Sequence, residues 1–192
     1  SGLALFPGNT ESPMNYTDNP YHFWQDSSFL YFFGLDLPGL AGIVDLDEHR
    51  SIIFGDDPTL DDIIWMGPQT PLAEKCTEAG ITETMHFKHL EEFLEEARRS
   101  GRHIHFLPPY RGETKLLLQQ ILGIDGNSVV EHSSVPLIKA VVKQREIKTE
   151  EEIGEIEAAV DLCHTMQVTA MKAARPGVFE REVVGAMEGA VI

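Results

Sequence analysis

Two segments rich in β-branched residues lie close together in this chain, with only a charged turn between them. They read AGIVDLD from Ala41 and SIIFGDD from Ser51, and the turn covers residues 47–50. Valine and isoleucine favour extended backbone, and a short polar connection lets two such segments pair. The pattern predicts an antiparallel β-hairpin, so the chain must fold around a β-sheet.

Helical and extended patterns alternate on either side of this hairpin. Strands are predicted at 3–6, 84–87 and 102–107, and helices at 60–66, 71–79, 88–100 and 114–122. The helix at 88–100 has the clearest amphipathic stripe, which consists of Leu90, Phe93, Leu94 and Ala97. Alternation of strands and helices is typical of an α/β fold. We predict a mixed β-sheet flanked by helices over residues 1–135.

The composition restricts the partners and the compartment. Asp and Glu number 31 against 15 Lys and Arg, which gives a net charge of −16 that repels nucleic acid and anionic membranes. No apolar run approaches the roughly 20 residues that span a bilayer. The two cysteines, Cys76 and Cys163, have no metal-binding or disulfide-framework spacing and are predicted to be free thiols. We therefore predict a cytoplasmic protein with no nucleic-acid or membrane partner.

Aromatic residues are concentrated between Tyr21 and Gly39, in the stretch YHFWQDSSFLYFFGLDLPG. The spacing i, i+3, i+4 predicts a short helix, capped by Ser27 and ended by Gly34, with one buried face made of Phe29, Phe32 and Phe33. The preceding aromatic residues alternate with polar ones, and such a rim suits a subunit interface or a binding edge; they are Tyr21, Phe23 and Trp24.

Several polar pairs could carry chemistry, but each has a simpler structural interpretation. The pairs His103/His105 and His86/His89 could hold a metal, yet no third ligand accompanies either of them. Asp56-Asp57 and Asp61-Asp62 could act as paired carboxylates in acid/base chemistry or bind a cation, but adjacent acids in a turn are more often solvated residues and helix caps. Motifs for a nucleophile elbow, a phosphate loop or a zinc protease are absent. We predict no catalytic residue and no metal ligand in this chain.

Trp65 has two possible roles. It follows Ile63-Ile64 and precedes Met66-Gly67, so by default it fills the core. The alternative is an aromatic anchor at a loop tip, where it would contact a partner.

The sequence changes character after residue 135. Residues 136–148 are rich in basic side chains and are interpreted as a linker. Thr149 and Glu152 have capping-box spacing and start a long helix with an apolar stripe, which Pro176-Gly177 ends. A further helix is predicted from Phe179 and still continues at Ile192. Residues 149–192 are therefore predicted to begin a second domain.

Two separated motifs resemble one family. YHFWQDSSFLYFFGLD is similar to the N-terminal-domain signature of aminopeptidase P, the Xaa-Pro aminopeptidases, although Trp24 stands where many members carry Arg. IKTEEEI from Ile147 and RPGVFE from Arg175 are similar to the family's junction and first catalytic-domain helices. The resemblance implies a creatinase-like, ribonuclease H-like N-terminal domain followed by the start of a pita-bread metallopeptidase domain.

The resemblance also implies an activity for the full-length parent protein. Members of the family remove the N-terminal residue from peptides with proline at position two. They use two divalent metals, usually manganese, held by two Asp, one His and two Glu. In the family these ligands lie well after the RPG element, beyond Ile192, so this chain alone is expected to be inactive and to bind no catalytic metal.

For this chain the resemblance implies a role in assembly and in access to the active site. Local alignment matches Trp65 to a tryptophan that reaches a neighbouring subunit's site, and Asp18 to an acid that pairs with an arginine there. The expected partners are its own catalytic domain, a second copy in a homodimer or homotetramer, and proline-containing peptides in the parent. Two alternatives remain: a prolidase, which cleaves only dipeptides, and a non-catalytic peptidase-like binding module such as that in the large subunit of the histone chaperone FACT.

Overall fold

The computed structural model describes residues 1–192 and divides into two compact units, Ser1–Ala140 and Val141–Ile192. Helix α6 (Val135–Arg145) crosses the division and occupies most of the segment that the sequence suggested as a linker. Ser134 caps this helix, since its side-chain oxygen accepts a hydrogen bond from Leu137 N at 3.3 Å.

The first unit is built on a five-stranded mixed sheet, which confirms the predicted fold class. Its order is β4-β3-β2-β1-β5, and its strands are β1 (Leu3–Pro7), β2 (Ala41–Asp45), β3 (Arg50–Phe54), β4 (Glu83–Met85) and β5 (Ile104–Phe106). The predicted hairpin is confirmed, because β2 and β3 pair antiparallel with Ile43 opposite Ile52. β1 is antiparallel to β2, while β5 is parallel to β1 and β4 is parallel to β3.

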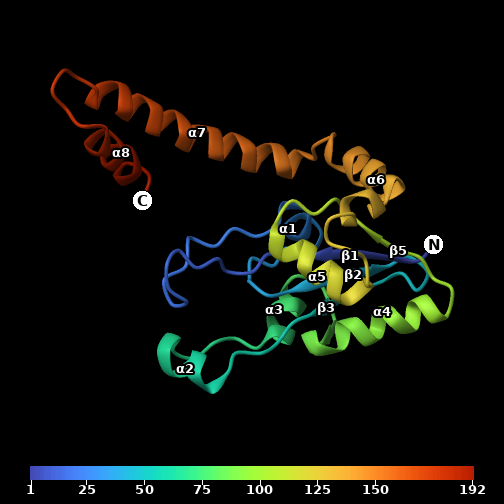
Figure 1. The fold of residues 1–192 in the computed structure, drawn as a ribbon. Helices are drawn as coiled ribbons and strands as arrows, with labels where there is room; N and C mark the ends of the chain where they lie inside the picture. The colour runs from blue at the N-terminus through green and yellow to red at the C-terminus, as the bar shows by residue number, and fades with distance from the viewer. The chain divides into compact units, whose positions relative to one another are not determined.

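This pairing places four strand ends together. Since β2 alone runs in the opposite direction, the carboxyl ends of β1, β3, β4 and β5 meet at one end of the sheet. The connections that follow β1 and β3, residues 8–26 and 55–71, both leave from this end (Figure 1). Segments that are far apart in the sequence can therefore contribute to one surface.

Helices cover both faces of the sheet. Helices α4 (Leu90–Arg99) and α5 (Gly112–Leu122) pack on the face formed by residues such as Leu5, Ile43 and Phe54. Alternate residues of the strands point to the other face. There α1 (Ser27–Phe33) packs so closely that a Cβ on Gly42 would lie 2.3 Å from the Phe33 ring. The start of α3 (Leu72–Glu78) lies on this second face too, against Gly55.

Two helix ends differ from the predictions. The N-cap of α1 is Asp26 rather than Ser27, since the Asp26 carboxylate accepts hydrogen bonds from Ser28 N and Phe29 N at 2.9 Å. A carboxylate at a helix N-terminus also interacts favourably with the helix dipole. Helix α8 (Glu180–Gly189) ends three residues before Ile192, so the prediction of a helix still running at the last residue was wrong.

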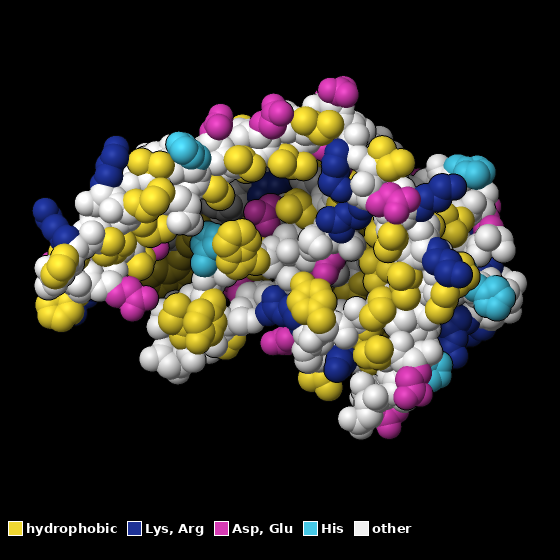
Figure 2. Space-filling model, turned by 90° about the horizontal axis from the view of Figure 1, so that it is seen from above, with side chains coloured by type: hydrophobic (Ala, Val, Ile, Leu, Met, Phe, Trp, Pro, Cys, Tyr) yellow, Lys and Arg dark blue, Asp and Glu magenta, His cyan; other side chains and the backbone are white.

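The second unit contains the long helix α7 (Glu150–Ala173), which contacts α8. The predicted capping box is present: Thr149 N donates to the Glu152 carboxylate at 2.8 Å, and Glu152 N donates to Thr149 Oγ1 at 3.2 Å. The apolar stripe of α7 is exposed at Ile153, Ile156 and Val160. Figure 2 shows how much hydrophobic surface one face of the molecule presents, with acidic side chains among it.

None of the helices has the length and apolar character needed to cross a membrane. Both cysteines are free thiols, as predicted, with Cys76 buried in α3 and Cys163 exposed on α7. Burial raises the pKa of the Cys76 thiol, so it stays protonated.

Candidate functional site

The two residues that the sequence singled out, Asp18 and Trp65, lie on the two connections that leave the carboxyl end of the sheet (Figure 1). Asp18 belongs to the connection after β1, and Trp65 to the helix α2 (Leu60–Met66) in the connection after β3. This end of the first unit is the candidate functional surface.

Asp18 lies near the tip of a hairpin-like loop. The loop is closed by a bridge between Pro13 and Pro20, and by the hydrogen bond from Tyr21 N to Ser12 O at 2.9 Å. The Asp18 side chain is exposed and makes no hydrogen bond or ion pair within the chain. A free carboxylate on a folded loop can contact a cation of another molecule without first breaking an internal contact.

The base of this loop is held by two residues whose roles sequence reasoning missed. Asn9 is only 5% exposed, and its side-chain amide donates to Trp24 O at 2.8 Å. The Gln25 side chain accepts from Asn9 N at 2.7 Å and from Asp26 N at 2.9 Å. It also donates to two carbonyls beyond α1, at 3.3 Å and 2.7 Å; they belong to Leu35 and Leu37. In the sequence, the only sign of these roles was the pair Gln25-Asp26 directly before the aromatic helix.

Helix α2 presents apolar side chains to solvent. Thr59 and Asp62 form its capping box, and Asp62 Oδ2 accepts from Thr59 N at 2.7 Å. No residue of α2 is buried, and Trp65 is 85% exposed, so the default prediction of a core tryptophan was wrong. Exposed apolar clusters are typical of surfaces that bind other molecules. The most exposed members of this cluster are Leu60, Ile64, Trp65 and Met66.

The aromatic stretch divides as its pattern suggested. Phe29 and Phe33 are buried, and the Phe32 ring lies 4.8 Å from that of Phe6. Tyr21 and Trp24 are exposed, at 58% and 75%, whereas Phe23 is half-buried. The helix therefore contributes to the core, and the residues before it enlarge the apolar surface near the Asp18 loop.

The acidic pairs serve mainly as caps and loop contacts. Asp57 Oδ1 accepts from Leu72 N at 2.7 Å, at the start of α3. Asp56 accepts from Phe87 N at 3.2 Å and lies 3.0 Å from His86 Nδ1. Hydrogen bonds from the Thr59 side chain and backbone lower the pKa of Asp62. These contacts confirm a structural role for Asp56, Asp57 and Asp62, while Asp61 is a solvated side chain.

The histidine pairs do not assemble a metal site. His105 Nδ1 lies 2.8 Å from Ser134 Oγ, and His89 Nδ1 lies 3.7 Å from Glu92. No group of three or more His, Cys, Asp or Glu side chains in the described chain is arranged to hold a metal ion. The arrangement offers exposed aromatic and acidic groups for binding.

The fold is an α/β domain whose polar and aromatic loops gather at one end of a mixed sheet, and comparison with known proteins identifies its family. The sequence profile of the family described as "Aminopeptidase P, N-terminal domain" matches residues 1–105, more than half of the chain. The chain belongs to this family, as its motifs predicted.

Relatives and solved structures agree with this assignment. A probable Xaa-Pro aminopeptidase of Aspergillus fumigatus is 27% identical over 172 residues, covering 88% of this chain and 35% of the relative. One of Sordaria macrospora is 26% identical over 181 residues, covering 90% of this chain and 29% of the relative. The chain thus spans about a third of the length of these relatives.

The fold itself is shared with Escherichia coli aminopeptidase P. A variant of that enzyme in complex with substrate superposes with a TM-score of 0.76 at 20% identity, covering 98% of this chain and 44% of that one. A zinc-substituted form in complex with product gives the same values. At 20% identity, the comparison shows that this chain has the same fold as that enzyme and nothing more.

Proposed function

We propose that this chain is the N-terminal portion of a metal-dependent Xaa-Pro aminopeptidase, in which it serves assembly and active-site access. The observation that carries the proposal is that the connections holding Asp18 and the exposed helix α2 both leave the same end of the sheet. The family assignment and the names of the relatives support the same activity for the parent. The parent would release the N-terminal residue from peptides with proline at position two.

The metals would be held outside this chain. The described residues supply no group of ligands that fits one metal ion, and still less two, so we assign no catalytic step to them. We propose that two divalent metals, manganese by resemblance, bind in the portion of the parent that follows Ile192. The free cysteines suit a reducing compartment, and we propose a cytoplasmic location.

The proposed assembly is a homodimer or homotetramer in which Asp18 and Trp65 meet a neighbouring subunit. Tryptophan in a desolvated pocket is among the residues that contribute most to interfaces. The Trp65 side chain is available for such a contact, because nothing in its own unit covers it.

The proposed activity is tested by the release of the N-terminal residue from an Xaa-Pro-Xaa tripeptide. We expect the full-length parent to release it with manganese, to stop when chelator is added, and this chain alone to release nothing. Cleavage of Xaa-Pro dipeptides but not of the tripeptide would identify a prolidase instead. A folded, metal-loaded parent that cleaves neither would fit a non-catalytic binding module.

Trp65→Ala is expected to weaken assembly of the parent without destabilising the fold. Loss of an interface tryptophan costs about 2 kcal/mol or more, which is roughly a thirtyfold change in the dissociation constant. An exposed side chain changes the free energy of unfolding by only about 0.5 kcal/mol. Sedimentation at several protein concentrations measures the first quantity, and urea unfolding of this chain measures the second.

Leu46→Ala provides the control for this substitution. Leu46 is an exposed apolar residue that follows β2, so it lies at the opposite end of the sheet. Its replacement is expected to leave assembly unchanged. The assigned surface is wrong if the Trp65→Ala variant assembles as tightly as the unsubstituted parent. It is also wrong if Trp65→Ala and Leu46→Ala weaken assembly equally.

A further inference from the structure

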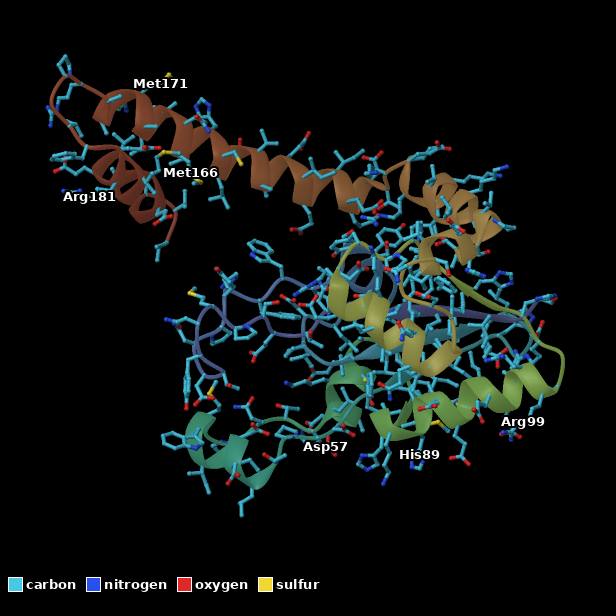
Figure 3. The ribbon with its side chains drawn as sticks, viewed as in Figure 1. Asp57, His89, Arg99, Met166, Met171 and Arg181 are labelled. Atoms are coloured by element: carbon cyan, nitrogen blue, oxygen red, sulfur yellow. The ribbon has the colours of Figure 1, made fainter.

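The edge of the sheet at β4 lies at the bottom of an open cavity of about 560 Å³. Leu72 and Ala73 of α3 form one wall, and Glu92, Phe93 and Glu96 of α4 form the other. These two helices lie on opposite faces of the sheet, so the cavity is a groove that runs along the strand edge. Figure 3 labels Asp57 and His89, which line the groove near α3 and α4.

The backbone of β4 leaves one residue's hydrogen-bonding groups unused. Met85 O accepts from Gly55 N at 3.0 Å, so the backbone groups of Met85 point toward β3. Successive residues of a strand direct their backbone groups to opposite edges. The amide and carbonyl of Thr84 therefore point into the groove, where no strand of the chain pairs with them. An unpaired edge of this kind is a template for an added strand.

The side chains that line the groove determine which kind of peptide can bind there as an added strand. Three carboxylates line it, from Asp57, Glu92 and Glu96, and no Lys or Arg does. The two histidines that line it already face carboxylates of the chain: His86 contacts Asp56 at 3.0 Å and His89 lies 3.7 Å from Glu92. The remaining lining is largely apolar, from residues such as Leu72, Met85 and Phe93.

From this geometry we propose that the groove binds an extended peptide segment of a partner, in which Lys or Arg alternates with apolar residues, as a sixth strand beside β4. The backbone pairs with Thr84, the cationic side chains point to the α4 wall and meet Glu92 and Glu96, and the apolar side chains point to the opposite wall and cover Leu72 and Ala73 of α3. A second copy of this chain is a poorer occupant, because its groove carries the same carboxylates and its net charge is also −16.

Fluorescence anisotropy with a defined probe tests this proposal. The probe is a labelled five-residue peptide of alternating lysine and valine, titrated with the 192-residue chain. A second probe has the same charge but carries N-methyl groups on two successive central amides, so that one of them faces β4 in either register. We expect the methylated probe to bind about fivefold more weakly, because it loses a strand hydrogen bond and clashes with the edge.

Charge variants locate the binding. Glu92→Gln together with Glu96→Gln is expected to weaken binding of the unmethylated probe about fivefold. The matched control, Glu155→Gln with Glu157→Gln, removes the same charge from exposed positions of α7 and is expected to have no such effect. Equal binding of the two probes, or equal loss in the two double variants, would overturn the proposal. A protein that is dimeric alone and dissociates when the probe is added would assign the groove to a second copy.

Discussion

Replacing Asp45 by asparagine is expected to lower the free energy of unfolding by about 3 kcal/mol, because it breaks a buried ion pair. Asp45 is fully buried at the end of β2, and its carboxylate pairs with the guanidinium of Arg102. It also accepts hydrogen bonds from Asp47 N and Glu48 N at 3.1 Å, which hold the turn of the hairpin. An amide can accept some of these bonds, but Arg102 loses its buried counter-charge and keeps only the partly exposed carboxylate of Asp47, 2.9 Å away. Urea unfolding followed by circular dichroism measures the change.

Glu48→Gln is the matched control. It removes the same charge three residues away, from an exposed side chain with no partner in the chain, and is expected to change stability by no more than about 0.5 kcal/mol. Equal stability of the two variants would mean that the Asp45 ion pair merely offsets its own desolvation.

The same carboxylate predicts a dependence of stability on pH. Burial alone would raise the pKa of Asp45, but hydrogen bonds from Arg102 and from the amides of Glu48 and Asp47 outweigh burial and lower it. The unfolded chain, with an aspartate pKa of about 3.9, therefore takes up the proton first as the pH falls. Stability is complete above about pH 5 and is lost progressively as the pH falls toward the folded pKa. Urea unfolding at several pH values between 6 and about 3 measures this dependence. As the pH falls, the free energy of unfolding should decrease more steeply for the wild-type chain than for Asp45→Asn.

Much of the fold follows from local sequence patterns. The hairpin of β2 and β3 was predictable because β-branched segments flank a polar turn, and α4 because its apolar residues recur on one helical face. The capping box of α7 is a purely local signal. Helix α6 was harder to predict. Ser134 and Pro136 are residues typical of a helix start, but the basic residues that follow them suggested a linker.

The candidate site was less predictable because it depends on contacts between distant segments. The resemblance to the family indicated Asp18 and Trp65, but their common end of the sheet becomes evident only from the strand pairing, in which four strands run in the same direction. Trp65 lies in an apolar run that is typical of a core helix, and no local rule indicates that α2 stays uncovered. Asn9 and Gln25 are separated by 16 positions, and hydrogen bonds over such a distance have no periodicity to detect.

Gln25→Glu is expected to destabilise the chain by about 3 kcal/mol, although it changes a single atom of the side chain. The glutamine accepts from two backbone amides, Asn9 N and Asp26 N, and donates to two carbonyls, Leu35 O and Leu37 O. Glutamate can accept but cannot donate at neutral pH. It therefore leaves both carbonyls unpaired and places a negative charge beside them. Urea unfolding at pH 7 measures the change.

Gln120→Glu is the control, since Gln120 is exposed on α5 and makes no side-chain hydrogen bond. It introduces the same charge and is expected to change stability by no more than about 0.5 kcal/mol. If Gln25→Glu is as stable as this control, Gln25 does not hold the loops together. If it is destabilised, the Gln-Asp pair of the family motif has a physical explanation. Gln25 fixes the base of the Asp18 loop, Asp26 caps the aromatic helix, and together they position the surface proposed to meet the neighbouring subunit.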